Sequence, residues 1–135
     1  MKKTIGIFIM AVLMITLWSA FRSGDKPKPW AVPETSSAKK NPVASNASSI
    51  ADGKELYTTH CASCHGKKGK GDGSKASQLE TECGDLSSAL SQKQTDGSLF
   101  YKIQTGRDDM PSFKKKIPEA DDVWSIVNYL RTLKP

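Results

Sequence analysis

The chain has 135 residues, a length that fits one small domain with appendages. Its composition, 37% hydrophobic and 25% charged, is that of a globular protein. The formal net charge is +6, but from Ser48 onward 13 Lys and Arg stand against 12 Asp and Glu, so the excess lies almost wholly before Ser48. The folded part is therefore nearly neutral, which removes the main support for nucleic-acid binding.

The first 21 residues have the pattern of an export or membrane segment. Lys2 and Lys3 precede an uncharged run of 18 residues from Thr4 to Phe21. This run is longer than the roughly 7–15 residues of a secretory hydrophobic region and falls in the roughly 17–25 residue range of a spanning helix. Trp18 and Arg22 are typical of interfacial anchors, and a small-residue cleavage motif is missing.

We therefore expect an uncleaved N-terminal membrane helix over residues 1–21, with a removed signal peptide as the alternative. The positive-inside rule keeps the two lysines in the cytoplasm, so the rest of the chain lies on the periplasmic or extracytoplasmic side. Cleavage would leave a soluble periplasmic protein in the same compartment.

Residues 22–47 have the composition of a tether. They are rich in Pro, Ser, Lys, Asn and Ala, and their few apolar residues follow no period. Such a segment cannot bury enough apolar surface to order itself. We expect a flexible linker here and a folded domain over residues 48–135.

The sequence pattern of the domain predicts an all-α fold. Ser48 and Ser49 are good N-cap residues for a first helix that runs up to Gly66, and Thr95 caps another that ends at Gly106. Between them, the glycine-rich stretch 66–73 with its lysines is expected to be a flexible basic loop. Pro118 opens the last helix, whose apolar stripe consists of Val123, Ile126, Val127 and Leu130. These three or four short helices provide only a thin apolar core, so something else should fill the middle.

The motif that carries chemistry is Cys61-Ala62-Ser63-Cys64-His65. Residues three apart on a helix share a face, so the thiols of Cys61 and Cys64 can meet the two vinyl groups on one porphyrin edge. Both would then be thioethers of a single haem c, and His65 can serve as the proximal iron ligand. The spacing predicts one covalently bound haem per chain.

Two alternatives to haem use the same CxxC spacing. A zinc site needs about four ligands, and beyond the motif the chain offers only His60 and Cys83 as soft or nitrogen donors. A thioredoxin-like dithiol needs a βαβ context, which the pattern lacks. Haem is favoured over both.

Met110 is the candidate for the second axial ligand. It is the one methionine that follows the N-terminal hydrophobic run, 45 residues after His65, in the polar stretch GRDDMPSF. Pro111 behind it favours an extended backbone rather than a core helix. A thioether is a soft neutral donor that favours Fe(II). A gap-filling role in the core is the alternative for Met110.

The sequence resembles the class I c-type cytochromes, specifically the small bacterial monohaem members. The resemblance covers about Ile50 to Leu133 and rests on CASCHG, DGSLFYKIQTGRDDMPSF and VWSIVNYLRTL, in that order. It implies a class I cytochrome c fold, a few short helices wrapped around one haem with His65 and Met110 in the axial positions. It also implies that the first and last helices cross where a glycine meets aromatic residues. The residues for that contact are Gly53, Tyr57, Trp124 and Tyr129.

The expected function is single-electron transfer between redox proteins in respiration, without catalysis, because two axial ligands leave no open iron site. Expected partners are a quinol-oxidising complex as donor and a terminal oxidase or reductase as acceptor. Lysines near the two haem-binding stretches could steer an acidic partner or simply be solvated. They are Lys67, Lys68, Lys70, Lys75, Lys114, Lys115 and Lys116.

Three alternatives stay open. One is a ligand-sensing or enzymatic haem protein in which Met110 does not bind iron, one is a zinc-binding module, and one is a dedicated subunit of a respiratory complex. His60 is interpreted as a packing histidine. Cys83 departs from the family pattern and is interpreted as an unpaired thiol, with a disulfide to another chain or a ligand role as alternatives.

Overall fold

Helices make up the regular structure of the part of the chain that the computed structural model describes, residues 29–134. From Val32 onward these residues belong to one compact unit. The elements are α2 (Glu34–Ser37), α3 (Ala47–His60), α4 (Ala62–His65), η1 (Ala76–Gln78), α5 (Ala89–Gln92), α6 (Asp96–Thr105) and α7 (Ala120–Arg131). No β-strand occurs in the described part, where one isolated bridge joins Arg107 and Met110. The all-α prediction is confirmed for this unit.

The predicted membrane segment, residues 1–21, lies outside the described residues, as do residues 22–28. None of the helices that the structure does describe is long and apolar enough to cross a bilayer. The N-terminal anchor therefore stays a prediction.

The helices begin and end close to the predicted signals. Asn46, rather than Ser48 or Ser49, is the N-cap of α3, because its side-chain oxygen accepts the Ser49 N–H at 3.0 Å while the Ser49 hydroxyl accepts the Asn46 N–H at 3.2 Å. Thr95 caps α6 as expected, and its hydroxyl accepts the Ser98 N–H at 3.2 Å. Pro118 lies two residues before α7 begins at Ala120.

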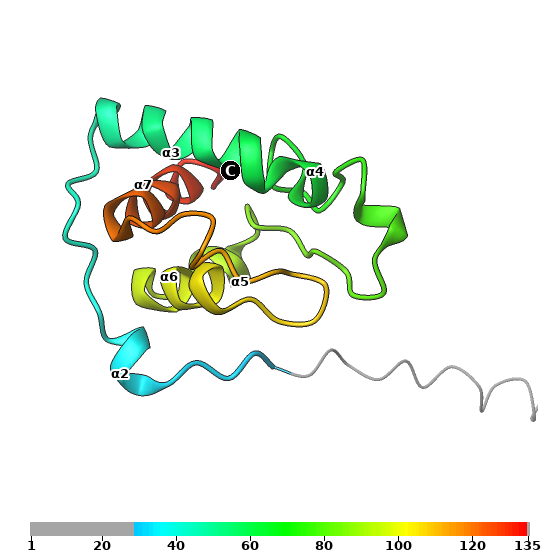
Figure 1. Cartoon of the computed structure of the whole chain (residues 1–135), viewed down its shortest axis with the longest axis horizontal. Helices are drawn as coiled ribbons and strands as arrows, with labels where there is room; N and C mark the ends of the chain where they lie inside the picture. Colours follow the sequence, from blue (N-terminus) through cyan, green and yellow to red (C-terminus); the bar gives the residue numbers. More distant parts are fainter. Residues whose placement is uncertain (1–28, 135) are drawn as a thin grey trace, which may run out of the picture. The chain divides into compact units, whose positions relative to one another are not determined.

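The crossing of α3 and α7 is the main packing contact of the unit. Figure 1 shows α3 along the top with α7 beneath it and α6 lower still. At the crossing, a Cβ added to Gly53 would lie 2.0 Å from the Ser125 carbonyl oxygen. Only a glycine allows the two backbones to come so close, so the predicted crossing is present at Gly53.

The aromatic residues at the crossing divide into two pairs. The rings of Tyr57 and Tyr129 lie 5.1 Å apart between α3 and α7, as the sequence predicts. Trp124 does not complete that contact. Its ring stacks on Phe100 of α6 at 4.1 Å, so Trp124 joins α7 to α6 while Tyr129 joins α7 to α3.

Helix α7 is buried on more faces than its apolar stripe predicts. Every residue from Val123 to Leu130 is buried, including the polar Ser125 and Asn128. The reason is that residues 41–44 cover the polar face: the Asn41 amide donates to the Asn128 side-chain oxygen at 2.9 Å, and the Asn128 amide donates to the Val43 carbonyl at 3.2 Å. These bonds satisfy a polar side chain that would otherwise be costly to bury.

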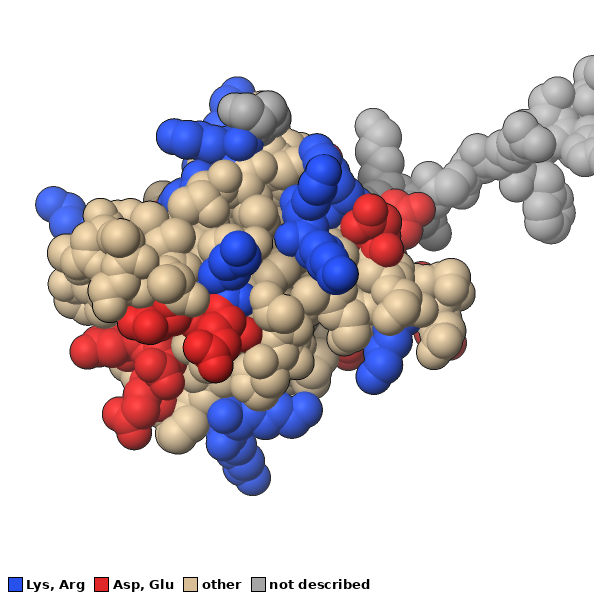
Figure 2. All heavy atoms as spheres, turned by 90° about the horizontal axis from the view of Figure 1, so that it is seen from above, with Lys and Arg blue, Asp and Glu red and all other residues tan. Residues whose placement is uncertain are grey.

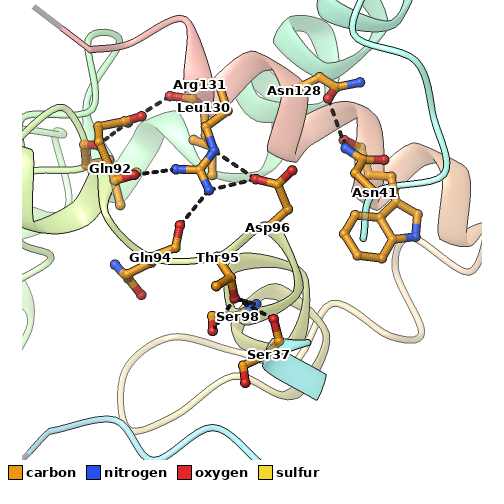
Figure 3. A network of polar contacts seen from close by, with 12 residues as sticks. Ser37, Asn41, Gln92, Gln94, Thr95, Asp96, Ser98, Asn128, Leu130 and Arg131 are labelled. Carbon is orange, nitrogen blue, oxygen red and sulfur yellow. Dashed lines mark hydrogen bonds and ion pairs between the residues drawn. The ribbon is translucent and has the colours of Figure 1, made fainter. Parts of the chain in front are cut away.

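Residues 32–47, which we name the strap, therefore differ from the predicted flexible linker. The Thr95 hydroxyl donates to the Ser37 carbonyl at 2.7 Å (Figure 3), and a Cβ on Gly97 would lie 2.2 Å from the Ser36 carbonyl oxygen. The strap is held by polar contacts to α6 and α7, and Val43 also packs against the core. The compact unit therefore begins at Val32, before the predicted boundary at 48. The composition of the segment, which has no hydrophobic period, does not reveal these contacts.

A second polar cluster fastens the end of α7. Arg131 lies in the last turn of α7, where a positive charge complements the helix dipole. Its guanidinium also binds the Asp96 carboxylate at 2.6 Å and donates to the carbonyls of Gln92 and Gln94 at 2.8 and 2.6 Å (Figure 3). The Gln92 amide donates back to the Leu130 carbonyl at 3.0 Å. These bonds fix the segment between α5 and α6 against the last turn of the chain.

The substitution Gly53→Ala tests the crossing. The added methyl group has no space beside Ser125, so we expect the free energy of unfolding to fall by about 1–3 kcal/mol or more, despite the better helix propensity of alanine. Thermal unfolding followed by circular dichroism measures the effect. Asp52→Ala, at the exposed neighbouring position of the same helix, is the control. Equal melting temperatures for the two variants would contradict the close approach.

Candidate functional site

The CASCH motif forms one helical turn at the point where α3 ends. Cys61 is both the C-cap of α3 and the N-cap of α4. Its carbonyl accepts the N–H groups of Cys64 at 3.1 Å and of His65 at 2.9 Å, and Gly66 ends the turn with a φ of 78°. This is the helical geometry that the spacing predicts for presenting two sulfurs on one face.

The two cysteines of the motif differ in their exposure. Cys61 is 9% exposed and belongs to the core, while Cys64 is half-buried, and both are free thiols in the structure. Burial, together with the neighbouring Cys64, raises the pKa of the Cys61 thiol to about 12. At neutral pH burial therefore favours the uncharged form of this side chain over a thiolate.

His65 carries a buried nitrogen without a hydrogen bond. Its Nδ1 atom has no partner among residues 29–134, the part that the structure describes. Burial also lowers the pKa of the imidazole, so the ring is neutral at pH 7 and keeps a lone pair free. A buried unpaired polar atom requires an explanation, and a metal ligand is one.

The loop after the motif is more ordered than the predicted flexible loop. The Gly71 N–H donates to the His65 carbonyl at 2.9 Å, and the Gly73 N–H donates to the Cys64 carbonyl at 3.1 Å. Tyr57 adds a bond from α3, because its hydroxyl donates to the Gly66 carbonyl at 2.7 Å. The loop is therefore folded back onto the CASCH turn by its own backbone.

Met110 lies at the end of a tight turn after α6. The N–H of Arg107 donates to the Met110 carbonyl at 2.8 Å, and the Met110 N–H donates back at 2.9 Å. Asp108 in this turn has a φ of 51°. The turn lies outside any helix and leaves Met110 half-buried against the core cluster that contains Cys61.

Contacts between aromatic rings bring the Met110 segment to the CASCH turn. The ring of Phe113, three residues after Met110, lies 6.1 Å from the ring of His60 in an edge arrangement. Because His60 directly precedes Cys61, these rings connect the two predicted haem-binding stretches. His60 is thus found in a packing contact, which agrees with its interpretation from the sequence.

Cys83 lies near both parts of the site. Burial raises the pKa of its thiol, and the neighbouring Cys64 and Asp109 raise the pKa further. The thiol is free and half-buried. The sequence contains no signal for this placement, because Cys83 belongs to an irregular segment between η1 and α5.

The comparisons with known proteins identify the family. Residues 48–130 match the family model described as cytochrome c oxidase, cbb3-type, subunit III. The chain belongs to this family and is a class I c-type cytochrome. It carries covalently bound haem c, and its cytochrome c domain implies electron transfer. This family match decides against the alternative of a zinc-binding module.

A solved structure supports the same conclusion. A chain of the reducing HAO-like protein complex of Kuenenia stuttgartiensis is similar to this one, with a TM-score of 0.62 and 25% sequence identity over 83% of the present chain. The match covers 53% of that chain, so the present protein spans about half the length of its structural relative. A comparison with curated protein sequences finds no match.

The residues of the site fit a haem. Two free thiols lie on one helical turn, and the turn ends in a neutral imidazole with a buried unpaired nitrogen. A polarizable thioether stands on a separate turn that packs against the same core. This donor set of two thiols, an imidazole and a thioether is that of a c-type haem with two protein ligands.

Counting thiols tests the attachment. If Cys61 and Cys64 are thioethers, haem-loaded protein unfolded in denaturant should react with one equivalent of a thiol reagent, at Cys83. The variant Cys83→Ser, loaded in the same way, should react with none. Three equivalents in the wild type and two in the variant would contradict thioether attachment.

Proposed function

We propose that this cytochrome carries single electrons between membrane-associated or periplasmic redox proteins, with haem c attached through Cys61 and Cys64. His65 and Met110 are the proposed axial ligands. The observation that carries the proposal is the buried, unpaired nitrogen of His65 at the end of the CASCH turn. The haem supplies reversible one-electron chemistry at its iron.

The protein's own residues perform three tasks in this proposal. Cys61, which is buried in the core, and Cys64 would fix the position of the porphyrin edge. His65, whose pKa is lowered by burial, would offer a neutral imidazole nitrogen to the iron at pH 7. Met110 would supply a thioether, a soft sulfur donor that favours reduced iron and raises the potential. With His65 and Met110 both holding the iron, substrates would have no open site on it.

Redox protein partners are implied by the family in general. We further propose a quinol-oxidising complex as donor and a terminal oxidase or reductase as acceptor. The description of the family as an oxidase subunit supports an oxidase as the neighbour, either as a fixed complex or by transient docking. Copurification in mild detergent distinguishes the two arrangements.

Some of the lysines near the two haem-binding stretches are available for docking a partner. Figure 2 shows basic side chains at several places on the visible face, with acidic side chains in a larger group at lower left and smaller groups at the right, next to basic ones. Lys67, Lys68 and Lys75 are exposed, whereas Lys70 forms an ion pair with Asp85 at 3.2 Å. Exposed lysines would attract an acidic partner at long range.

Met110→Ala tests the axial ligand and with it the function. Ferric wild-type protein should show the weak sulfur-to-iron charge-transfer band, and the variant should lose that band completely and have a lower reduction potential, because a thioether favours Fe(II). Lys114→Ala, an exposed neighbour, is the control and should keep both properties. A wild-type protein without the band would favour a ligand-sensing or enzymatic haem protein instead.

We also propose that residues 1–21 remain as a membrane anchor, with the domain on the periplasmic side. The intact mass of protein extracted from washed membranes should then equal the whole chain plus one haem. A chain in which a cleavable signal peptide replaces residues 1–21 is the control and should appear in the soluble periplasmic fraction. A shortened mass in the wild type would establish cleavage.

A further inference from the structure

The Met110 turn is tied to a distant segment by one hydrogen bond. The backbone N–H of Thr81 donates to the Asp109 carboxylate at 2.8 Å, although 28 residues separate them in the sequence. Asp109 directly precedes Met110. A carboxylate acceptor strengthens such a bond, whereas its exposure to solvent weakens it, so we assign it an ordinary net strength.

The two carboxylates of the turn have different partners. Asp108 forms an ion pair with Arg107 at 3.1 Å, within the turn itself. Asp109 instead reaches out of the turn to the segment 79–87, which connects η1 to α5. The turn is thus shaped by its own residues and attached to the rest of the unit through Asp109.

The other end of segment 79–87 is attached to the loop that follows the CASCH turn. The Leu86 N–H donates to the Gly69 carbonyl at 2.7 Å, and the Lys70 ammonium binds Asp85 at 3.2 Å. Cys83, between these attachments, is close enough to Cys64 and Asp109 for both to raise the pKa of its thiol. Segment 79–87 therefore bridges the two haem-binding stretches through the protein alone.

We propose that Asp109 is a positioning residue, which holds the Met110 turn against segment 79–87 and so keeps the thioether over the iron. Without the bond to Thr81, the turn keeps its internal hydrogen bonds but loses this external attachment. Met110 then leaves the iron more often. This inference rests on the proposed ligation by Met110.

Competition with imidazole tests the proposal. Imidazole binds ferric haem only when Met110 is displaced, so its apparent affinity reports how often the ligand leaves. We expect the affinity to rise about fivefold in Asp109→Ala, the factor that corresponds to one hydrogen bond of ordinary net strength. Asp109→Asn keeps an acceptor oxygen and should restore most of the wild-type behaviour.

Variants of Thr81 address the same bond from the donor side. Thr81→Pro removes the backbone N–H and should raise the imidazole affinity as Asp109→Ala does, and combining the two changes should add little. Thr81→Ala keeps the N–H and is the matched control. Asp108→Asn, in the same turn and paired with Arg107 within it, is a second control, and both controls should bind imidazole as the wild type does.

Amide hydrogen exchange provides a second measurement that does not depend on imidazole. The Thr81 amide should be protected in haem-loaded wild-type protein and should exchange faster in Asp109→Ala, which is informative even if Thr81→Pro fails to fold. If the wild type shows the charge-transfer band but Asp109→Ala binds imidazole no more tightly than Thr81→Ala, the positioning role is wrong while the ligation stands. If the wild type lacks the band, both proposals are wrong.

Discussion

The close approach of α3 and α7 at Gly53 is the contact on which the rest of the structure depends. Cys61 ends α3, so the place where α3 rests on α7 also determines where the CASCH turn is held. The same crossing brings Tyr57 against Tyr129 and allows the Tyr57 hydroxyl to reach Gly66. The close backbone contact at Gly53 therefore determines the position of the CASCH turn, two helical turns further along the chain.

The parts of the molecule that follow local rules could be predicted from the sequence. Thr95 begins a helix, Gly66 and Gly106 end helices, and the spacing of the two cysteines specifies one turn. These features depend on residues within a few positions of one another. The donor set of the candidate site follows from the same motif, together with the isolated position of Met110.

The parts that depend on distant polar contacts could not be predicted. The strap is ordered by Asn41 and Asn128, 87 residues apart, and no period or composition rule connects two asparagines. Arg131 in the last turn of α7 binds Asp96 and the carbonyls of Gln92 and Gln94, and no local sequence rule connects these residues. The bond from Thr81 to Asp109 is of the same kind. In a unit with a thin apolar core, such hydrogen bonds hold segments in place whose sequences show no hydrophobic pattern.

The folded-back loop after the CASCH turn bears on how fast an electron can move. The rate of such a transfer depends on how far nuclei and dipoles must shift when the charge on the redox centre changes. Here the carbonyls of Cys64 and His65 are already occupied by N–H groups of the loop, so these dipoles are fixed before the charge changes and have little freedom to reorient. Glycines that look like a source of mobility thus contribute to a low reorganisation energy.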